Sequence, residues 1–220
     1  MSQTKRLGRR EFLILGATTL GGAAWAALRQ PEIKMDEYTC ALAENSQTKI
    51  LVAYGSRYGA TAGVASAIAE ALCKTGVAAD AKHIASVTDL SAYDAAIIGA
   101  PVNSDEWMSE VVEFVGANRS QLSQMPVAYF LTCMTLGLTN QPEAREKIAA
   151  VLQAVEKQIP EVKPLDKGLF AGALDYGKMS VAMQMMYRAF AEDGTSGDFR
   201  DWDAIRAWGG SVGIKLLASS

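Results

Sequence analysis

From Lys49 onward the chain alternates short apolar runs with longer amphipathic segments, and this alternation constrains the fold more than any other feature. Ile50–Tyr54 is a nearly continuous apolar run, the pattern of a strand buried on both faces. Further strands are predicted at 77–84, 95–100, 126–133 and 169–174, and helices at 61–74, 107–117, 142–159, 179–191 and 202–217. Five strands separated by helices predict a doubly wound α/β fold, a parallel sheet covered on both faces.

The first 30 residues differ in composition from the rest. The start is basic, with Arg9 and Arg10 at its end, and residues 12–28 carry no charge and are rich in Gly, Ala and Leu. This order predicts an export signal at 1–30; an N-terminal membrane anchor shares it, but 17 residues interrupted by glycines are short for a span. Gly8–Leu13 resembles the twin-arginine export motif, which implies contact with the export machinery through Arg9 and Arg10. We therefore expect a periplasmic or otherwise extracytoplasmic protein, membrane-tethered if the signal is not cleaved.

The charge and hydropathy of the chain that follows the predicted signal argue against two kinds of partner, nucleic acid and the membrane interior. Residues 31–48 are polar with little periodicity and are predicted to be a linker. From Pro31 onward, 16 Lys and Arg stand against 23 Asp and Glu, so the mature chain is acidic and we expect no binding to nucleic acid. No uninterrupted apolar run of 18 residues follows the signal, so we expect no integral membrane domain after its removal.

Cysteine and histidine usage argues against a metal centre. The odd number of cysteines (Cys40, Cys73 and Cys133), without a Cys-x-x-Cys pair, argues against a disulfide framework and against a zinc site. Cys73 is predicted to be packed and inert within a helix. His83 is the only histidine and is interpreted as structural.

The loop after the first predicted strand has the chemistry of a phosphate site. It contains Ser56, Arg57, Tyr58, Gly59, Ala60 and Thr61. Unsatisfied N–H groups and the dipole at a helix N-terminus attract anions, and the glycines allow the backbone to approach a ligand. The dinucleotide fingerprint and the nucleotide triphosphatase loop are both missing. The alternative is a plain strand-to-helix turn in which Thr61 is the N-cap residue.

A family resemblance favours the phosphate interpretation. Lys49–Thr61 resembles the flavodoxin signature, in which a strand ends in a Ser/Thr-rich loop around the phosphate of flavin mononucleotide (FMN). Ile97–Val102, Phe170–Tyr176 and Asp201–Ile205 are similar to segments of the flavodoxin-like, menaquinone-dependent protoporphyrinogen oxidases. The resemblance implies a flavodoxin-like domain at 49–217, a doubly wound five-stranded parallel sheet with strand order 2-1-3-4-5, and FMN as cofactor.

Two more loops are expected to complete the cofactor site, because ligands of such sheets bind beyond the carboxyl ends of the strands. The loop after the third strand offers Pro101, Val102, Asn103 and Trp107. Trp107 is a candidate for stacking on the flavin, with a core position as the equal alternative. The loop after the fourth strand offers Thr132, Cys133, Met134, Thr135 and Gly137. Cys133 is either redox-active or packed and inert, and its place at the end of a buried strand favours the second.

The sequence thus predicts an exported FMN-binding redox protein. The resemblance implies oxidation of protoporphyrinogen with electrons passed to a quinone, but the export signal favours another substrate. No catalytic acid or base is expected, because the cofactor carries the chemistry. The alternative is a binding module that keeps the fold and has lost the flavin.

Overall fold

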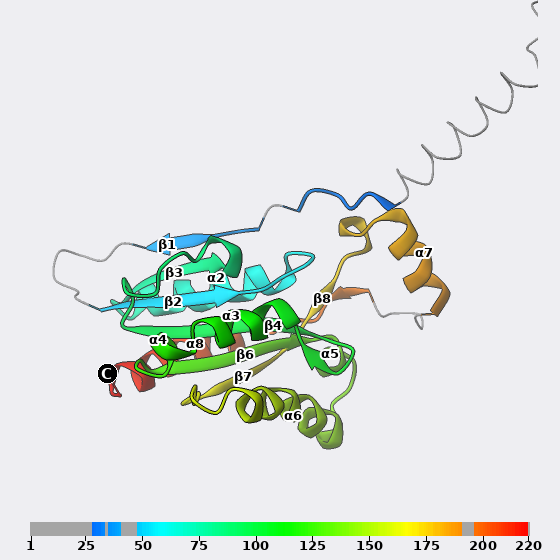
Figure 1. The fold of residues 1–220 in the computed structure, drawn as a ribbon. Coiled ribbons are helices and arrows are strands. Elements are labelled where there is room, and N and C mark those ends of the chain that lie inside the picture. Colours follow the sequence, from blue (N-terminus) through cyan, green and yellow to red (C-terminus); the bar gives the residue numbers. More distant parts are fainter. Residues whose placement is uncertain (1–27, 34, 41–47, 191–195, 220) are drawn as a thin grey trace, which may run out of the picture. The chain divides into compact units, whose positions relative to one another are not determined.

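A computed structural model describes residues 28–33, 35–40, 48–190 and 196–219, drawn in colour in Figure 1. The chain divides into two compact units, Met1–Glu32 with Tyr176–Asp193, and Ile33–Asp175 with Gly194–Ser220. The predicted export signal therefore lies outside the described residues, except for residues 28–30. Among the described helices, none combines the length and hydropathy that crossing a bilayer requires.

The larger unit is built around a mostly parallel sheet. Its strands are β1 (Tyr38–Cys40), β2 (Lys49–Tyr54), β3 (Ala78–His83), β4 (Ala95–Asn103), β5 (Glu106–Trp107), β6 (Val127–Cys133) and β7 (Lys167–Ala171). β3, β2, β4, β6 and β7 lie side by side and are all parallel, in the predicted order, but the sheet of the described residues has seven strands and is mixed, so the prediction of a five-stranded, all-parallel sheet is corrected. Two short antiparallel strands extend this sheet: β1 beside β3, and β5 beside the end of β4. A separate pair is formed by β8 (Ala173–Leu174) and β9 (Gly197–Asp198).

Helices cover both faces of the sheet (Figure 1). The α-helices of the larger unit are α2 (Ala60–Lys74), α3 (Ser109–Ala117), α4 (Arg119–Leu122), α5 (Thr135–Leu138), α6 (Pro142–Gln158) and α8 (Trp202–Leu217), with a 3-10 turn at Ile84–Ser86. Along β2, Leu51 and Ala53 pack with α3 and α6, whereas Ile50, Val52 and Tyr54 pack with α2 and α8. This two-sided burial explains why the strand is a continuous apolar run in the sequence.

The smaller unit contains a 3-10 turn at Tyr176–Lys178 and α7 (Val181–Phe190). Within it, the ring of Tyr176 lies 6.3 Å from the ring of Tyr187 and 5.7 Å from the guanidinium of Arg188. This helix corresponds to the one predicted at 179–191.

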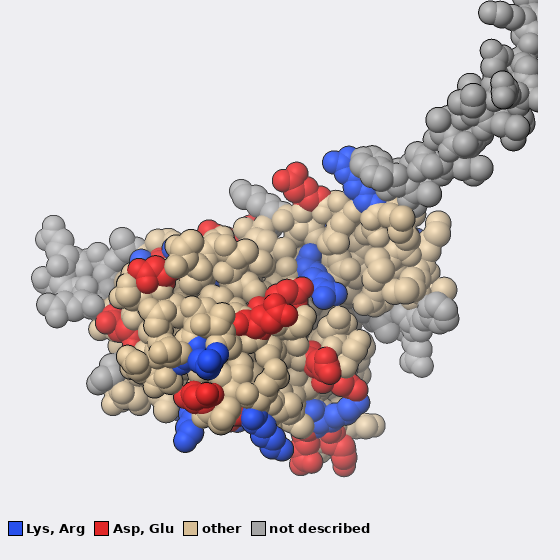
Figure 2. All heavy atoms as spheres, in the orientation of Figure 1, with Lys and Arg blue, Asp and Glu red and all other residues tan. Residues whose placement is uncertain are grey.

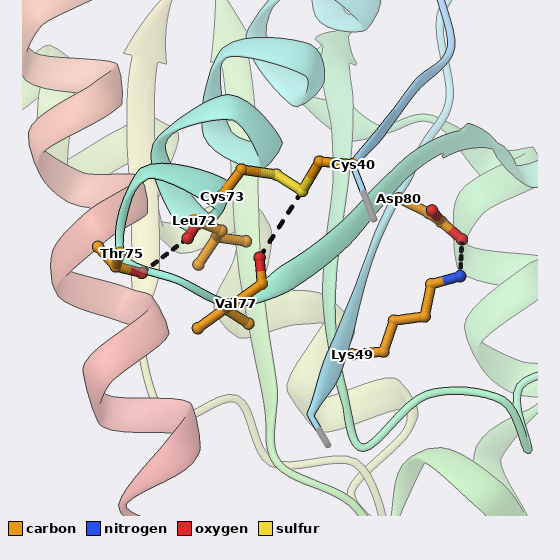
Figure 3. Close-up of a disulfide and its surroundings, with 7 residues drawn as sticks. All are labelled: Cys40, Lys49, Leu72, Cys73, Thr75, Val77 and Asp80. Atoms are coloured by element: carbon orange, nitrogen blue, oxygen red, sulfur yellow. Dashed lines mark hydrogen bonds and ion pairs between the residues drawn. A yellow bond between two sulfur atoms is a disulfide. The ribbon is translucent and has the colours of Figure 1, made fainter. Parts of the chain in front are cut away.

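The edge of the sheet corrects two sequence predictions. Tyr38–Cys40 is a strand rather than part of a linker, and Cys40 forms a disulfide with Cys73 of α2 (Figure 3). The expectation that the cysteines form no disulfide is therefore wrong, because two of them pair and the third, Cys133, stays free and buried. The disulfide holds the three-residue strand β1 against the edge of β3 that does not pair with β2.

A buried carboxylate lies near this edge. Asp80 of β3 is 2% exposed, pairs with Lys49 at 2.7 Å and accepts a hydrogen bond from the Tyr93 hydroxyl at 2.8 Å (Figure 3 shows the lysine pair). Burial raises the pKa of Asp80, but the hydrogen bonds from Lys49, Tyr93 and Thr39 and the positive charge of Lys49 together outweigh it, and the net effect is a pKa below the usual range. On the face drawn in Figure 2, acidic and basic side chains are interspersed over the described residues.

Candidate functional site

The carboxyl ends of β2, β4, β6 and β7 bring the sequence-predicted loops together. The register places Tyr54 beside Gly99 and Pro101 beside Thr132, so the second loop lies between the first and the third. Gly55 donates its backbone N–H to the Gly99 carbonyl at 2.9 Å, at the point where β2 ends. The edge that the topology predicts for a ligand is thus formed by the three predicted loops.

The first loop ends in a helix that lacks a side-chain cap. Gly59 is the N-cap residue of α2 and has φ 80°, a left-handed conformation that favours glycine. The hydroxyl of Ser56 accepts a hydrogen bond from the Gly59 N–H at 3.0 Å and closes the loop. No side chain caps the helix, so the N–H groups of its first turn, at Ala60–Ala62, are available to an anion. The alternative in which Thr61 is the N-cap is wrong.

Thr61 instead bonds across the site. Its hydroxyl lies 2.9 Å from the hydroxyl of Thr132 at the end of β6, and both residues are buried. Two hydroxyls carry two protons, and their mutual hydrogen bond uses one of them. The pair therefore retains one O–H that can donate to a further acceptor, and it joins the first loop to the third.

Arg57 and Tyr58 lie at the outer part of the first loop. Arg57 is half-exposed, with its guanidinium 3.8 Å from the carboxylate of Glu110 on α3. The pKa of Glu110 is lowered by hydrogen bonds from its own backbone and from Ser109, and the charge of Arg57 adds to this. Tyr58 is partly exposed.

The second loop is a tight hairpin. β4 and β5 pair as Val102 with Trp107 and Asn103 with Glu106, and the two residues between them have positive φ, 52° at Ser104 and 62° at Asp105. Positive φ at both central residues is the geometry of a type I′ turn. Pro101 and Val102 are partly buried, and Asn103 is exposed.

This hairpin turns Trp107 into the core. The residue is 4% exposed, its indole N–H donates to the Ala100 carbonyl at 3.2 Å, and its ring lies 5.2 Å from that of Tyr129. The ring packs in the core, and its N–H has a hydrogen-bond acceptor within the protein. The prediction that Trp107 stacks on a flavin is therefore corrected in favour of its alternative, a core position.

The third loop combines buried and exposed residues. Thr132 and Cys133 are buried, Met134 is partly exposed, and Thr135 is exposed at the start of α5. Gly137 lies against Phe199, because a Cβ at this position would meet the Phe199 side chain at 2.4 Å. The burial of Cys133 favours the packed over the redox-active interpretation.

The structure adds Arg200 to the site, a residue that the sequence did not indicate. Arg200 donates from Nη1 to the Ala60 carbonyl at 2.9 Å and makes two 2.7 Å hydrogen bonds to the carboxylate of Asp198. Its guanidinium lies over the ring of Trp202, 4.3 Å from the centroid. The Arg200 hydrogen bonds lower the pKa of Asp198. The contact to Ala60 spans 140 residues, and the only local signal was the Asp198-x-Arg200 spacing.

Comparison with known proteins agrees with this architecture. Residues 51–199 match the family model described as "Flavodoxin domain". A flavodiiron protein from Giardia intestinalis has the same fold, with TM-score 0.50 and 15% identity over 78% of this chain and 37% of that chain. A flavodoxin from the domain Archaea matches with TM-score 0.48 and 15% identity over 77% of this chain and 99% of its own. Flavodoxin 2 from Bacillus cereus matches with TM-score 0.45 and 16% identity over 79% and 100%. No curated protein matches the sequence.

Proposed function

The chain belongs to the flavodoxin family, and from this premise we propose that its Ser56–Thr61 loop holds the phosphate of FMN in a redox protein. The single observation that carries the proposal is the uncapped first turn of α2, which lies where the ends of β2, β4 and β6 meet. Helix N-termini with free N–H groups bind phosphate through hydrogen bonds and the helix dipole. A side-chain cap would occupy these groups, and at α2 none does so.

The residues present fit a phosphate monoester. Ala60, Thr61 and Ala62 would hold it through backbone N–H groups, and the Thr61–Thr132 hydroxyl pair has one O–H to donate. The glycine at 59 leaves the approach to these amides without a side chain. When bound, the flavin supplies electron-transfer chemistry, while the protein positions it, excludes water and sets the local electrostatics.

We further propose that the protein works in an oxidising compartment outside the cytoplasm. The basic-then-apolar N-terminal segment suggests export, and the Cys40–Cys73 disulfide supports the same location independently. Disulfides persist in secreted and periplasmic proteins and are rare in the reducing cytosol. A quinone as electron acceptor fits this location. In this proposal the protein shares its fold with the protoporphyrinogen oxidases by ancestry but acts on a different substrate.

The visible spectrum of the purified protein tests the flavin proposal. We expect the two absorption bands of an oxidised flavin, either as isolated or after reconstitution with FMN. A reconstituted protein without these bands would refute the proposal and favour a binding module that has lost the flavin.

Substitution of Thr61 tests the location of the phosphate. Thr61→Val removes a hydroxyl, and we expect FMN affinity to fall by about tenfold or more, because a hydrogen bond to a charged group contributes about 1.5–3 kcal/mol. Thr61→Ser retains the hydroxyl and should bind FMN nearly as the wild type does. Thr75→Val at the other end of α2, where the hydroxyl bonds only the Leu72 carbonyl, is the matched control. Equal affinity in the Thr61→Val and Thr75→Val proteins would mean that the phosphate lies elsewhere.

A further inference from the structure

Arg200 is fixed against the first turn of α2 by a set of directed contacts. The carboxylate of Asp198 holds the guanidinium on one side through Nε and Nη2, both at 2.7 Å, and the ring of Trp202 supports its face. The third contact is the hydrogen bond from Nη1 to the Ala60 carbonyl. The Arg200 side chain is 15% exposed, whereas that of Asp198 is about half-exposed, so the guanidinium is held at the edge of the solvent. A paired and stacked guanidinium of this kind keeps one orientation.

Glycine at position 63 makes this approach possible. A Cβ on Gly63 would lie 2.9 Å from Nη1 of Arg200 and 3.5 Å from the Trp202 ring. A larger residue there would push the guanidinium off the helix. The segment that carries Arg200 is itself attached to the candidate site, because Phe199 donates its N–H to the Gly172 carbonyl at 3.1 Å.

The Ala60 carbonyl belongs to the same peptide unit as the Thr61 N–H. The peptide bond is planar, and in the trans form its C=O and N–H point in opposite directions. In a helix the carbonyl points toward the C-terminus and the N–H toward the N-terminus, where the uncapped amides of α2 lie. A donor that fixes and polarises the Ala60 carbonyl therefore also orients the Thr61 N–H and strengthens it as a donor.

We propose that Arg200 is a positioning residue for the phosphate: through the Ala60–Thr61 peptide it aims the Thr61 N–H, and it thereby makes the site select phosphorylated over unphosphorylated flavin. This inference rests on the proposed function and adds to it the basis of ligand choice. Arg57 has a different role, because it is half-exposed and its guanidinium lies 3.8 Å from Glu110. The selectivity of the site thus comes from a residue outside the three predicted loops.

Binding of FMN and of riboflavin, which lacks the phosphate, to a set of variants tests the proposal. For Arg200→Gln we expect FMN affinity to fall about tenfold with riboflavin affinity unchanged within about twofold, because only the phosphate uses the Thr61 N–H. Arg206→Gln is the matched control, since Arg206 also lies over Trp202, at 6.0 Å, and pairs with Asp203. The amide resonance of Thr61 in flavin-free protein provides a second readout, and it should shift in Arg200→Gln and not in Arg206→Gln.

Asp198→Asn separates positioning from charge. If Arg200 acted through its charge alone, removing the nearby carboxylate would raise the affinity for FMN. If it acts by holding the peptide, loosening the guanidinium lowers the affinity. Tighter FMN binding by Asp198→Asn, an unchanged FMN affinity in Arg200→Gln, or an equal loss for both flavins would each overturn the inference while leaving the proposed function intact. A wild-type protein that binds neither flavin would overturn both.

Discussion

Removal of the Cys40–Cys73 disulfide has an effect on stability that can be worked out from its position. The two residues are 33 positions apart, and the chain-entropy relation for a loop of that size gives about 12.5 cal/mol/K, or about 3.7 kcal/mol at 25 °C. We therefore expect reduction, or the double substitution Cys40→Ala/Cys73→Ala, to lower the free energy of unfolding by about 3–4 kcal/mol. For a chain of this length the corresponding fall in melting temperature is about 7–15 °C.

Urea unfolding of the wild type with and without reductant measures this effect. Mass spectrometry before and after alkylation of the thiols confirms the redox state of each sample. Cys133→Ala is the matched control, because Cys133 is buried and free, so this variant should keep the full response to reductant. A reduced wild type that unfolds at the same urea concentration as the oxidised protein would refute the reasoning. A loss in the double variant without a loss on reduction would assign the effect to packing around the sulfurs.

Two further predictions concern the core and the buried carboxylate. Gly99→Ala should lower the free energy of unfolding by about 3 kcal/mol or more, because its Cβ would lie 2.0 Å from the Phe130 ring; Gly116→Ala, with nothing nearer than 3.7 Å, should be tolerated. Burial raises the pKa of Asp80, but its contacts, chiefly with Lys49 and Tyr93, lower it by more, so the net pKa lies below the usual range. The lowered pKa stabilises the folded state. This contribution is complete above the unfolded-state pKa of about 3.9 and is lost as the pH falls through the folded-state pKa. Unfolding measured from pH 6 down to about 2.5 should show this loss in the wild type, and a pH dependence in Asp80→Asn equal to that of the wild type would contradict it.

The parts of the fold that the sequence predicted are those in which local pattern and tertiary environment agree. β2, β4 and β6 are buried on both faces and therefore appear as apolar runs, and α8 begins and ends at the predicted residues. β1 was missed because three partly exposed residues produce no periodicity that distinguishes a strand from a linker. Its partner and its disulfide both lie at least 33 residues away in sequence, so only the folded chain brings them together.

The candidate site divides in the same way. The location of the three loops follows from topology, because the carboxyl ends of parallel strands meet at one edge of the sheet, and the predicted order of five strands was confirmed. The direction of a side chain within a loop depends on one or two backbone angles, which the sequence did not indicate. At Trp107, the positive φ values of Ser104 and Asp105 turn the strand back and point the indole into the core.

For Arg200, the sequence shows a side chain that can form an ion pair, but it does not show which part of the fold that side chain contacts. An arginine two residues after an aspartate pairs locally, and such exposed pairs contribute little to stability. Only the packing of the Gly197–Trp202 segment against α2 brings this guanidinium to the Ala60 carbonyl. The first turn of α2 lies near the start of the domain, and Arg200 lies near its end. Their contact makes the geometry of the proposed phosphate-binding turn depend on the C-terminal part of the chain. Substitutions at Gly63, Asp198 or Trp202 should therefore alter ligand affinity without touching any of the three loops, which a site defined by loop motifs alone would not predict.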